Sequence, residues 1–240
     1  MTARSSPNLR TRLKICGLTR EADVDAAVAA GADAIGFVLY EKSPRYVPIH
    51  RAAGLARRLP PFVTPVLLFV NAPLDEVVAA VAVVGPALLQ FHGDETPEQC
   101  LDTARAAGSA YIKVARIPLG EATARFDLVE YAAHYRSAQA ILLDAFVEGY
   151  GGGGKTFNWS LLPPNVNCHL VLSGGLTPAN VTDGILQLRP RCKTLAVDVS
   201  SGVEMSKGIK DATLIHQFVA AVRAADKQFA ESLDVPVPTT

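Results

Sequence analysis

Short apolar runs alternate with amphipathic stretches along most of the chain. The runs are four to six residues long and rich in Leu, Ile, Val and Ala: "LKIC", "AIGFVL", "PVLLFV", "LLQFH", "YIKVA", "ILLDAF", "LVLS" and "LAVDVS". Continuous apolar runs of this length are typical of strands in a parallel sheet, because both faces of such a sheet are covered. The pattern therefore predicts eight parallel strands separated by helices.

The stretches between the runs carry helix start and stop signals. In "TREADVDAAVAAG" the capping residue Thr19 precedes acidic residues, and Gly31 ends the predicted helix. In "TPEQCLDTARAAG" Thr96 and Gln99 are spaced for a capping box, with proline at the first helical position. The stretch "TPANVTDGILQL" predicts a further helix from Thr177. Strand and helix thus repeat every ~30 residues, as in βαβ units.

Eight such units predict an α/β fold, a single (βα)8 TIM barrel. A doubly wound open sheet is the alternative, because periodicity alone does not close a sheet. After "ILLDAF" a glycine-rich loop and "FNWSLL" run into Pro163 and Pro164, so we expect an irregular, shortened sixth helix region. The barrel is expected to span residues 12–230, with a flexible N-terminal extension at 1–11 and a flexible tail at 231–240.

Composition points to a small-molecule partner. The formal net charge is zero, with 23 Lys plus Arg and 23 Asp plus Glu, so no overall field recruits nucleic acid or a membrane. No run of about 18 apolar residues is present to span a bilayer, and the first residues lack a signal-peptide pattern, so we expect a cytoplasmic location. Without a C-x-x-C pair we expect four free thiols: Cys16, Cys100, Cys168 and Cys192.

Polar side chains gather where the predicted strands end. In barrels of this kind the chemistry takes place at the carboxyl ends of the strands, where the connecting loops converge. Strand alternation lets Cys16 and Asp144 project into one cavity from different sides of the ring. Cys16 is then a candidate nucleophile or base, and an inert buried cysteine is the alternative. The same face carries further residues that either contact a ligand or hydrogen-bond within the barrel: Lys14, Gln90, His92, Asp198 and Ser200.

Two glycine-bearing loops predict an anion site. Gly174 and Gly175 let the backbone approach a ligand just before a predicted helix, and Ser200 and Ser201 follow the next strand. Loops after strands seven and eight hold phosphate in many barrels, which favours a phosphorylated substrate, although simple turn chemistry explains any single glycine.

Three other features leave alternatives open. Residues 149–156, "GYGGGGKT", match a phosphate-loop pattern and so suggest a nucleotide triphosphatase, but Pro163 arrives too soon for the helix that such a loop requires. Arg45 lies in a loop after the second strand, where it is either solvated or forks onto a carboxylate. Lys113, with Lys14 and Asp198, forms either an internal ion-pair network or part of a site.

Taken together, seven motifs resemble the phosphoribosylanthranilate isomerase family of tryptophan biosynthesis. They occur in order between about residue 12 and about residue 222: "KICGLT", "DAIGFVLYEKSPRYV", "LLFVN", "LLQFHGDE", "LLDAFVEGYGGGGKTFNW", "LSGGLTPANV" and "AVDVSSGVE".

The resemblance implies an activity and roles for particular residues. The family performs an Amadori rearrangement of N-(5′-phosphoribosyl)anthranilate to 1-(2-carboxyphenylamino)-1-deoxyribulose 5-phosphate, and it requires no metal or organic cofactor. Cys16 matches the family's general base, Asp144 its general acid and Arg45 its clamp for the substrate carboxylate. The remaining matches belong to substrate binding: Gly174, Gly175, Ser200 and Ser201 to the phosphate grip, and Asp198 and Gln90 to the same pocket. We expect a monomer that binds a small phosphorylated substrate.

Competing functions remain possible at the level of sequence alone. One is a broader sugar-phosphate isomerase, whose barrels resemble a design with aspartate as the base, and Cys16 argues against it. The others are the nucleotide triphosphatase and a non-catalytic phosphate-binding barrel. The latter predicts that ligand affinity is intact in Cys16→Ala and Asp144→Asn.

Overall fold

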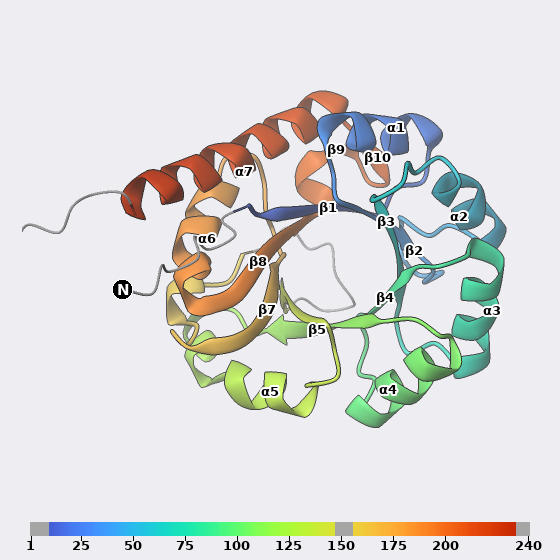
Figure 1. Ribbon diagram of the computed structural model, residues 1–240, viewed down its shortest axis with the longest axis horizontal. Helices are drawn as coiled ribbons and strands as arrows, with labels where there is room; N and C mark the ends of the chain where they lie inside the picture. Colours follow the sequence, from blue (N-terminus) through green and yellow to red (C-terminus); the bar gives the residue numbers. More distant parts are fainter. Residues whose placement is uncertain (1–9, 147–155, 234–240) are drawn as a thin grey trace, which may run out of the picture.

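The structure, a computed structural model, describes residues 10–146 and 156–233. Eight parallel strands form a closed barrel in sequence order, which confirms the predicted fold class (Figure 1). The first strand pairs with the second and also with the eighth, so an open sheet is excluded. The strands are β1 (Arg12–Cys16), β2 (Ala34–Val38), β3 (Thr64–Phe69), β4 (Leu88–Phe91), β5 (Tyr111–Ile117), β6 (Ala140–Ala145), β7 (Val166–Leu172) and β8 (Cys192–Val199).

Helices surround the barrel on its outside (Figure 1). Between β6 and β7 the described residues contain only a short 3₁₀ turn, η2 (Trp159–Leu161), so the shortened sixth helix region is confirmed. A two-stranded hairpin of β9 (Glu204–Ser206) and β10 (Ile209–Lys210) follows β8. The helices are α1 (Glu21–Ala30), α2 (Ile49–Ala56), α3 (Leu74–Val84), α4 (Pro97–Ala106), α5 (Leu128–His134), α6 (Val181–Leu188) and α7 (Ala212–Leu233), with 3₁₀ turns η1 (Gly120–Arg125), η3 (Arg189–Arg191) and η4 (Ser201–Val203).

Helix boundaries agree with the sequence signals in some places and differ in others. The capping box of α4 is formed by Thr96 and Gln99 as predicted. The cap predicted at Thr19 is wrong, because α1 begins after Arg20 and the Thr19 hydroxyl donates to the backbone oxygen of Gly208 instead. The prediction that α6 begins near Thr177 is also wrong, since a turn precedes its first residue, Val181.

Two apolar layers hold the barrel together. The main core lies between the outer face of the strands and the helices, and it includes Ile15, Ile35 and Leu143, each fully buried. A separate cluster fills part of the barrel interior: Ile112, Val114, Leu142 and Val171. Residues on a strand alternate between the two layers, so the inward face of the strands is free to carry the site.

The ends of the described chain are anchored to each other. Thr11, predicted to belong to the N-terminal extension, is fully buried, and its backbone N–H donates to Asp226 of α7 over 2.9 Å. Helix α7 continues to Leu233, beyond the predicted barrel boundary at 230.

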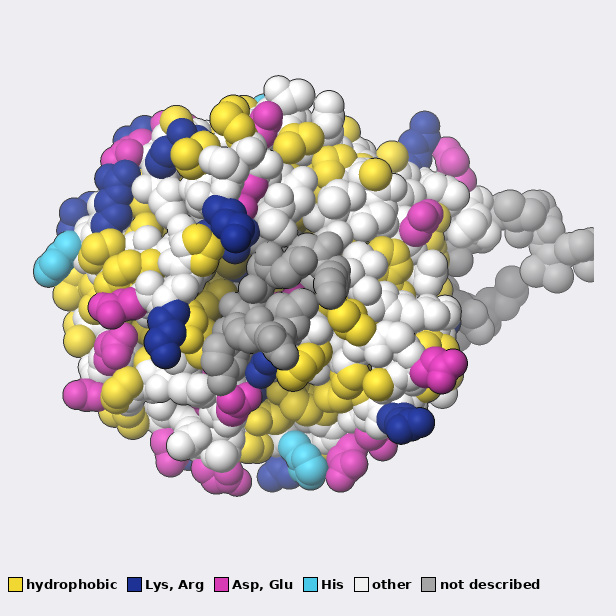
Figure 2. Space-filling view, turned by 180° about the vertical axis from the view of Figure 1, so that it is seen from behind, with side chains coloured by type: hydrophobic (Ala, Val, Ile, Leu, Met, Phe, Trp, Pro, Cys, Tyr) yellow, Lys and Arg dark blue, Asp and Glu magenta, His cyan; other side chains and the backbone are white. Residues whose placement is uncertain are grey.

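The outer surface carries a balanced charge. On the face seen in Figure 2, acidic and basic side chains are interspersed rather than segregated. Among the described helices, none is long and apolar enough to cross a membrane.

Candidate functional site

Cys16 ends β1 inside the barrel, next to a buried ion pair. Lys14, two residues earlier on the same face, donates from Nζ to Oδ1 of Asp198 on β8 over 2.8 Å, and both side chains are almost fully buried. The neighbouring strand carries Gly36, where a Cβ atom would lie 2.7 Å from the Cys16 Sγ and 3.0 Å from the Lys14 Nζ. Glycine at this position therefore leaves the space that the thiol and the ammonium group occupy.

Burial dominates the ionisation of Cys16. It raises the pKa of the thiol, Lys14 and Lys210 act in the opposite direction, and the net shift is upward. For Lys14, burial lowers the pKa, but the charges of Asp198 and Cys16 more than offset it, so its pKa is raised. Lys14 therefore favours the thiolate, but burial outweighs it and the thiol is the favoured form.

Asp144, the next-to-last residue of β6, is joined to His92 and, through His92, to Gln90. Oδ2 of Asp144 lies 3.1 Å from Nε2 of His92, and Nδ1 of His92 lies 3.2 Å from Nε2 of Gln90. With the Gln90 amide donating to Nδ1, the His92 ring donates from Nε2 to Oδ2 of Asp144. Gln90 is fully buried, and its Oε1 atom has no hydrogen-bond partner among the described residues.

A series of contacts across β8 and β7 connects the surroundings of Cys16 to those of Asp144. Ser173, directly after β7, donates to Oδ2 of Asp198 over 3.3 Å, and Asp198 in turn accepts from Lys14 beside the thiol. The next residue, Gly174, lies so close to β6 that a Cβ atom there would be 2.9 Å from Oδ1 of Asp144. The thiol on β1 and the carboxyl group on β6 thus lie at the same end of the barrel, with β7 and β8 between them.

Arg45 is held in a buried cluster of three charges. Its Nε and Nη2 atoms each donate to Glu204 of the hairpin over 2.7 Å, and Lys210 donates to the same carboxylate over 2.8 Å. Its stem lies over Gly17, where a Cβ atom would be 2.5 Å from the arginine Cδ. Two cations share one carboxylate, so the cluster carries a net positive charge beside Cys16.

The charged groups of this cluster shift one another's pKa values. Hydrogen bonding to Glu204 raises the pKa of Arg45, and burial lowers the pKa of Lys210. Burial by itself raises the pKa of Glu204, but Arg45 and Lys210 outweigh it and the net shift is downward. Glu204 and Lys210 were not identified from the sequence. The only signal was the position of Glu204 at the end of the motif "AVDVSSGVE".

The two loops predicted to hold an anion pack against each other. Gly174 and Gly175 both have positive φ, at 78° and 63°, and within the described part of the chain their N–H groups have no acceptor. Gly202 in η4 lies against the other loop, because a Cβ atom there would be 1.8 Å from the Leu176 oxygen. Ser200, one residue after β8, donates to the backbone oxygen of Cys16 over 3.0 Å. Ser201 begins η4.

Lys113 serves a different network from that of Lys14 and Asp198. Its Nζ donates to Glu95 and to the Gly93 oxygen, each over 2.8 Å. Glu95 also accepts from the backbone N–H groups of Asn71 and Gly93. This buried pair fixes the loop after β4, which begins with His92.

All four cysteines are free thiols. Most of the phosphate-loop match at 149–156 lies outside the described residues. Within residues 10–146 and 156–233 no group of three or more His, Cys, Asp or Glu side chains is arranged to hold a metal ion.

The fold and the ionisable side chains gathered at one end of the strands define an enzyme of the (βα)8-barrel class. Comparison with known proteins narrows the class. Residues 13–221 match the family model of N-(5'phosphoribosyl)anthranilate (PRA) isomerase. The chain belongs to this family of isomerases.

Individual relatives agree with the family model. The N-(5'-phosphoribosyl)anthranilate isomerase of Methylibium petroleiphilum is 61% identical over 224 residues, which is 93% of this chain and 99% of the relative. The enzyme of the same name from Dechloromonas aromatica is 56% identical over 219 residues, with 91% and 99% covered. The crystal structure of phosphoribosyl anthranilate isomerase from Thermotoga maritima superposes with a TM-score of 0.78 at 40% identity, covering 89% of this chain and 99% of that one.

A further solved structure of this isomerase contains reduced 1-(o-carboxyphenylamino)-1-deoxyribulose 5-phosphate. That protein is 37% identical in sequence to this chain. The two structures superpose with a TM-score of 0.74, and the match covers 89% of this chain and 99% of that protein's chain.

Proposed function

We propose that the chain converts N-(5′-phosphoribosyl)anthranilate to 1-(2-carboxyphenylamino)-1-deoxyribulose 5-phosphate by an Amadori rearrangement in tryptophan biosynthesis. The observation that carries the proposal is the placement of Cys16 and Asp144 at one end of the barrel, on either side of the glycine loops after β7 and β8. The family match supports it, and so does the similar isomerase with a reduced product analogue bound.

The reaction needs one acid and one base. Asp144 donates a proton to the ribose ring oxygen, the ring opens to an iminium ion, and Cys16 removes the proton from C2′ to give the enolamine. His92 and Gln90 keep the Asp144 carboxyl group in place through the hydrogen bonds already described. Because burial raises the pKa of Cys16, the thiolate is the minority form, and Lys14 and Lys210 are the nearby groups that stabilise it. No cofactor takes part in the proposed steps.

Substrate binding is assigned to the charged cluster and the two loops. Glu204 accepts from Nε and Nη2 of Arg45. We propose that the Nη1 atom of Arg45 donates to the anthranilate carboxylate. That carboxylate would also balance the net positive charge of the cluster. The N–H groups of Gly174 and Gly175, with Ser200 and Ser201, receive the phosphate. Two further contacts to the substrate are proposed, through Oε1 of Gln90 and through Asp198.

The proposal extends to the state and location of the protein. All proposed site residues come from one chain, and we propose that it acts as a monomer in the cytoplasm, without nucleic acid or a membrane as partner. One similar structure from Thermotoga maritima is described as monomers made from a dimeric isomerase, so that relative differs in its natural state.

The activity has a direct assay. The anthranilate group makes the substrate fluorescent, and we expect the signal to decay when the purified protein is added without metal or organic cofactor. Chelator should leave the rate unchanged. Folded protein that fails to accelerate the decay would contradict the proposed function.

A further inference from the structure

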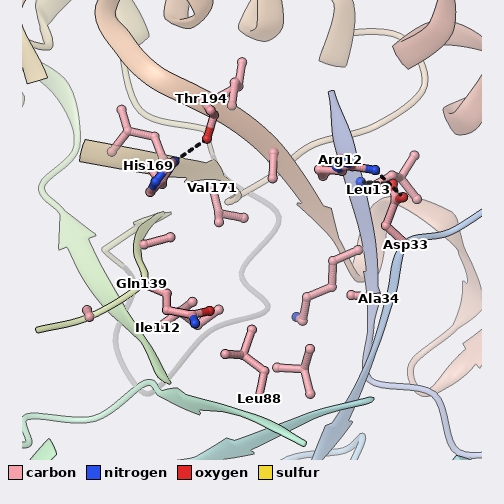
Figure 3. A pocket seen from close by; sticks show the side chains of 17 residues that line it. Arg12, Leu13, Asp33, Ala34, Leu88, Ile112, Gln139, His169, Val171 and Thr194 are labelled. Atoms are coloured by element: carbon pink, nitrogen blue, oxygen red, sulfur yellow. Dashed lines mark hydrogen bonds and ion pairs between the residues drawn. The ribbon is translucent and has the colours of Figure 1, made fainter. Parts of the chain in front are cut away.

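A second cavity opens at the end of the barrel opposite to the candidate site. Its volume is about 590 Å³, and it is lined by residues at the N-terminal ends of the strands (Figure 3). Sites for small molecules usually occupy ~300–1,000 Å³. The proposed reaction makes no use of this space.

Small side chains leave the interior of the barrel unfilled here. Barrel interiors are normally packed with bulky branched residues, but β2, β6 and β8 contribute Ala34, Ala140 and Ala196 to this layer. All three are only half-buried although they lie on the inward face. Larger apolar side chains in the wall include Val66, Leu88, Ile112 and Val171.

Arginine side chains lie at one side of the opening. Asp33 accepts from Arg10 over 2.6 Å and lies 3.4 Å from Arg12, so two guanidinium groups share one carboxylate. The side chain of Arg12 is 55% exposed. Further round the same end, Arg189 and Arg223 likewise share Asp226. An anion at this opening can reach the exposed guanidinium group of Arg12, because Asp33 lies closer to Arg10 than to Arg12.

Hydrogen-bonding groups lie across the opening from Arg12. Nδ1 of His169 is 2.6 Å from the Thr194 hydroxyl, and Gln139 lies nearby on the same side (Figure 3). At the inner end, the Lys14 stem lines the cavity while its ammonium group is neutralised by Asp198. The exposed cation that lines the cavity is therefore Arg12, at the outer opening.

We propose that this cavity is a second binding site, for a small apolar molecule that carries one carboxylate or comparable anionic group. The apolar body fills the space beside the three alanines and removes their surface from water. The anion lies at the opening and pairs with Arg12. Because the cavity and the candidate site are at opposite ends of the barrel, this ligand and the substrate bind at the same time.

The test uses 2-naphthoate as the anionic probe and naphthalen-2-ylmethanol as its neutral counterpart. With the reduced product analogue saturating the candidate site, calorimetry should show one equivalent of 2-naphthoate bound. Ala140→Leu fills the cavity and should weaken this binding at least tenfold, whereas the matched exposed control Ala79→Leu should not change it. Arg12→Gln should weaken binding of the acid several-fold and leave binding of the alcohol unchanged.

Three results would overturn the proposal: no binding to the wild-type protein, displacement of the probe by the product analogue, or equal affinity for acid and alcohol in both wild type and Arg12→Gln. Amide chemical shifts of the wild-type protein provide a test that does not depend on folding of the variants. Shifts confined to the N-terminal ends of the strands support the proposal, and shifts confined to the Cys16 and Asp144 end contradict it.

Discussion

The Cys16 thiol lies among charges of both signs, and its reactivity depends on their balance. Burial and the Asp198 carboxylate favour the thiol, while Lys14 and Lys210 favour the thiolate. The lysines therefore determine how much base is available at a given pH, and Asp198 limits their effect by pairing with Lys14.

Alkylation of Cys16 by iodoacetamide measures this balance, because only the thiolate reacts. Since the pKa of Cys16 is raised, its rate at pH 8 should be below that of a free cysteine and should still be rising above pH 9. Asp198→Asn removes a charge that raises this pKa, so the rate at pH 8 should increase about threefold or more, given that one pK unit changes the thiolate population tenfold. Lys14→Met should act in the opposite direction. A rate independent of pH, or a slower Asp198→Asn protein, would contradict the assignment of charges.

Arg45 is expected to act on binding rather than on the chemical step. Arg45→Ala removes a charge-assisted hydrogen bond to the substrate carboxylate, so KM should rise about ten- to a hundredfold while kcat changes little. Steady-state kinetics measure both constants. Arg51→Ala, which removes an exposed arginine paired with Glu21, is the control and should leave KM unchanged. An unchanged KM in Arg45→Ala would contradict the proposed contact between Arg45 and the substrate carboxylate.

At the scale of elements, two loops at the reacting end are each held by a buried ion pair. The loop after β4 depends on Lys113 and Glu95, and the loop after β2 depends on Arg45 and Glu204. Burying a charge is costly unless its partner is present, so these pairs fix loop position more than they add stability.

Lys113→Met should leave Glu95 buried without its partner and lower the free energy of unfolding by about 3–5 kcal/mol. Urea denaturation measures the change. In the double variant Lys113→Met/Glu95→Gln both charges are gone, so its stability should lie closer to that of the wild type. A double variant less stable than Lys113→Met would show that the pair is not the source of the effect.

The sequence predicts the elements well where the signal is local. Eight apolar runs gave eight strands, and Thr96 with Gln99 gave the cap of α4. The Thr19 cap failed because Gly208, far along the chain, offers its hydroxyl an acceptor that no local pattern reveals. For the same reason Glu204 went unrecognised, since its contact with Arg45 spans 159 positions and exists only once the barrel closes.

Closure of the barrel also explains which features of the candidate site could be predicted from the sequence. Strand alternation placed Cys16 and Asp198 on the inward face, and the ion pair of Lys14 with Asp198 agrees with that placement. Alternation gives no information about the ionisation of Cys16, because burial and three surrounding groups, Lys14, Asp198 and Lys210, set it together.

At the scale of the whole molecule, a single closed barrel supplies every proposed site residue. We therefore expect a monomer in solution, with a mass of 25.4 kDa by light scattering across a tenfold range of concentration. A constant mass of twice that value would contradict the monomer, although it would leave the proposed reaction in place.

The central claim is that a thiol and a carboxyl group, held at one end of this barrel, exchange protons with one sugar phosphate. The most direct measurement is kcat for Cys16→Ala and for Asp144→Asn, together with the affinity of each for the reduced product analogue. The account predicts that each substitution lowers kcat at least about a hundredfold, as expected for loss of an acid or a base, while the analogue binds nearly as tightly as to wild type. Turnover near the wild-type rate in either variant would contradict it.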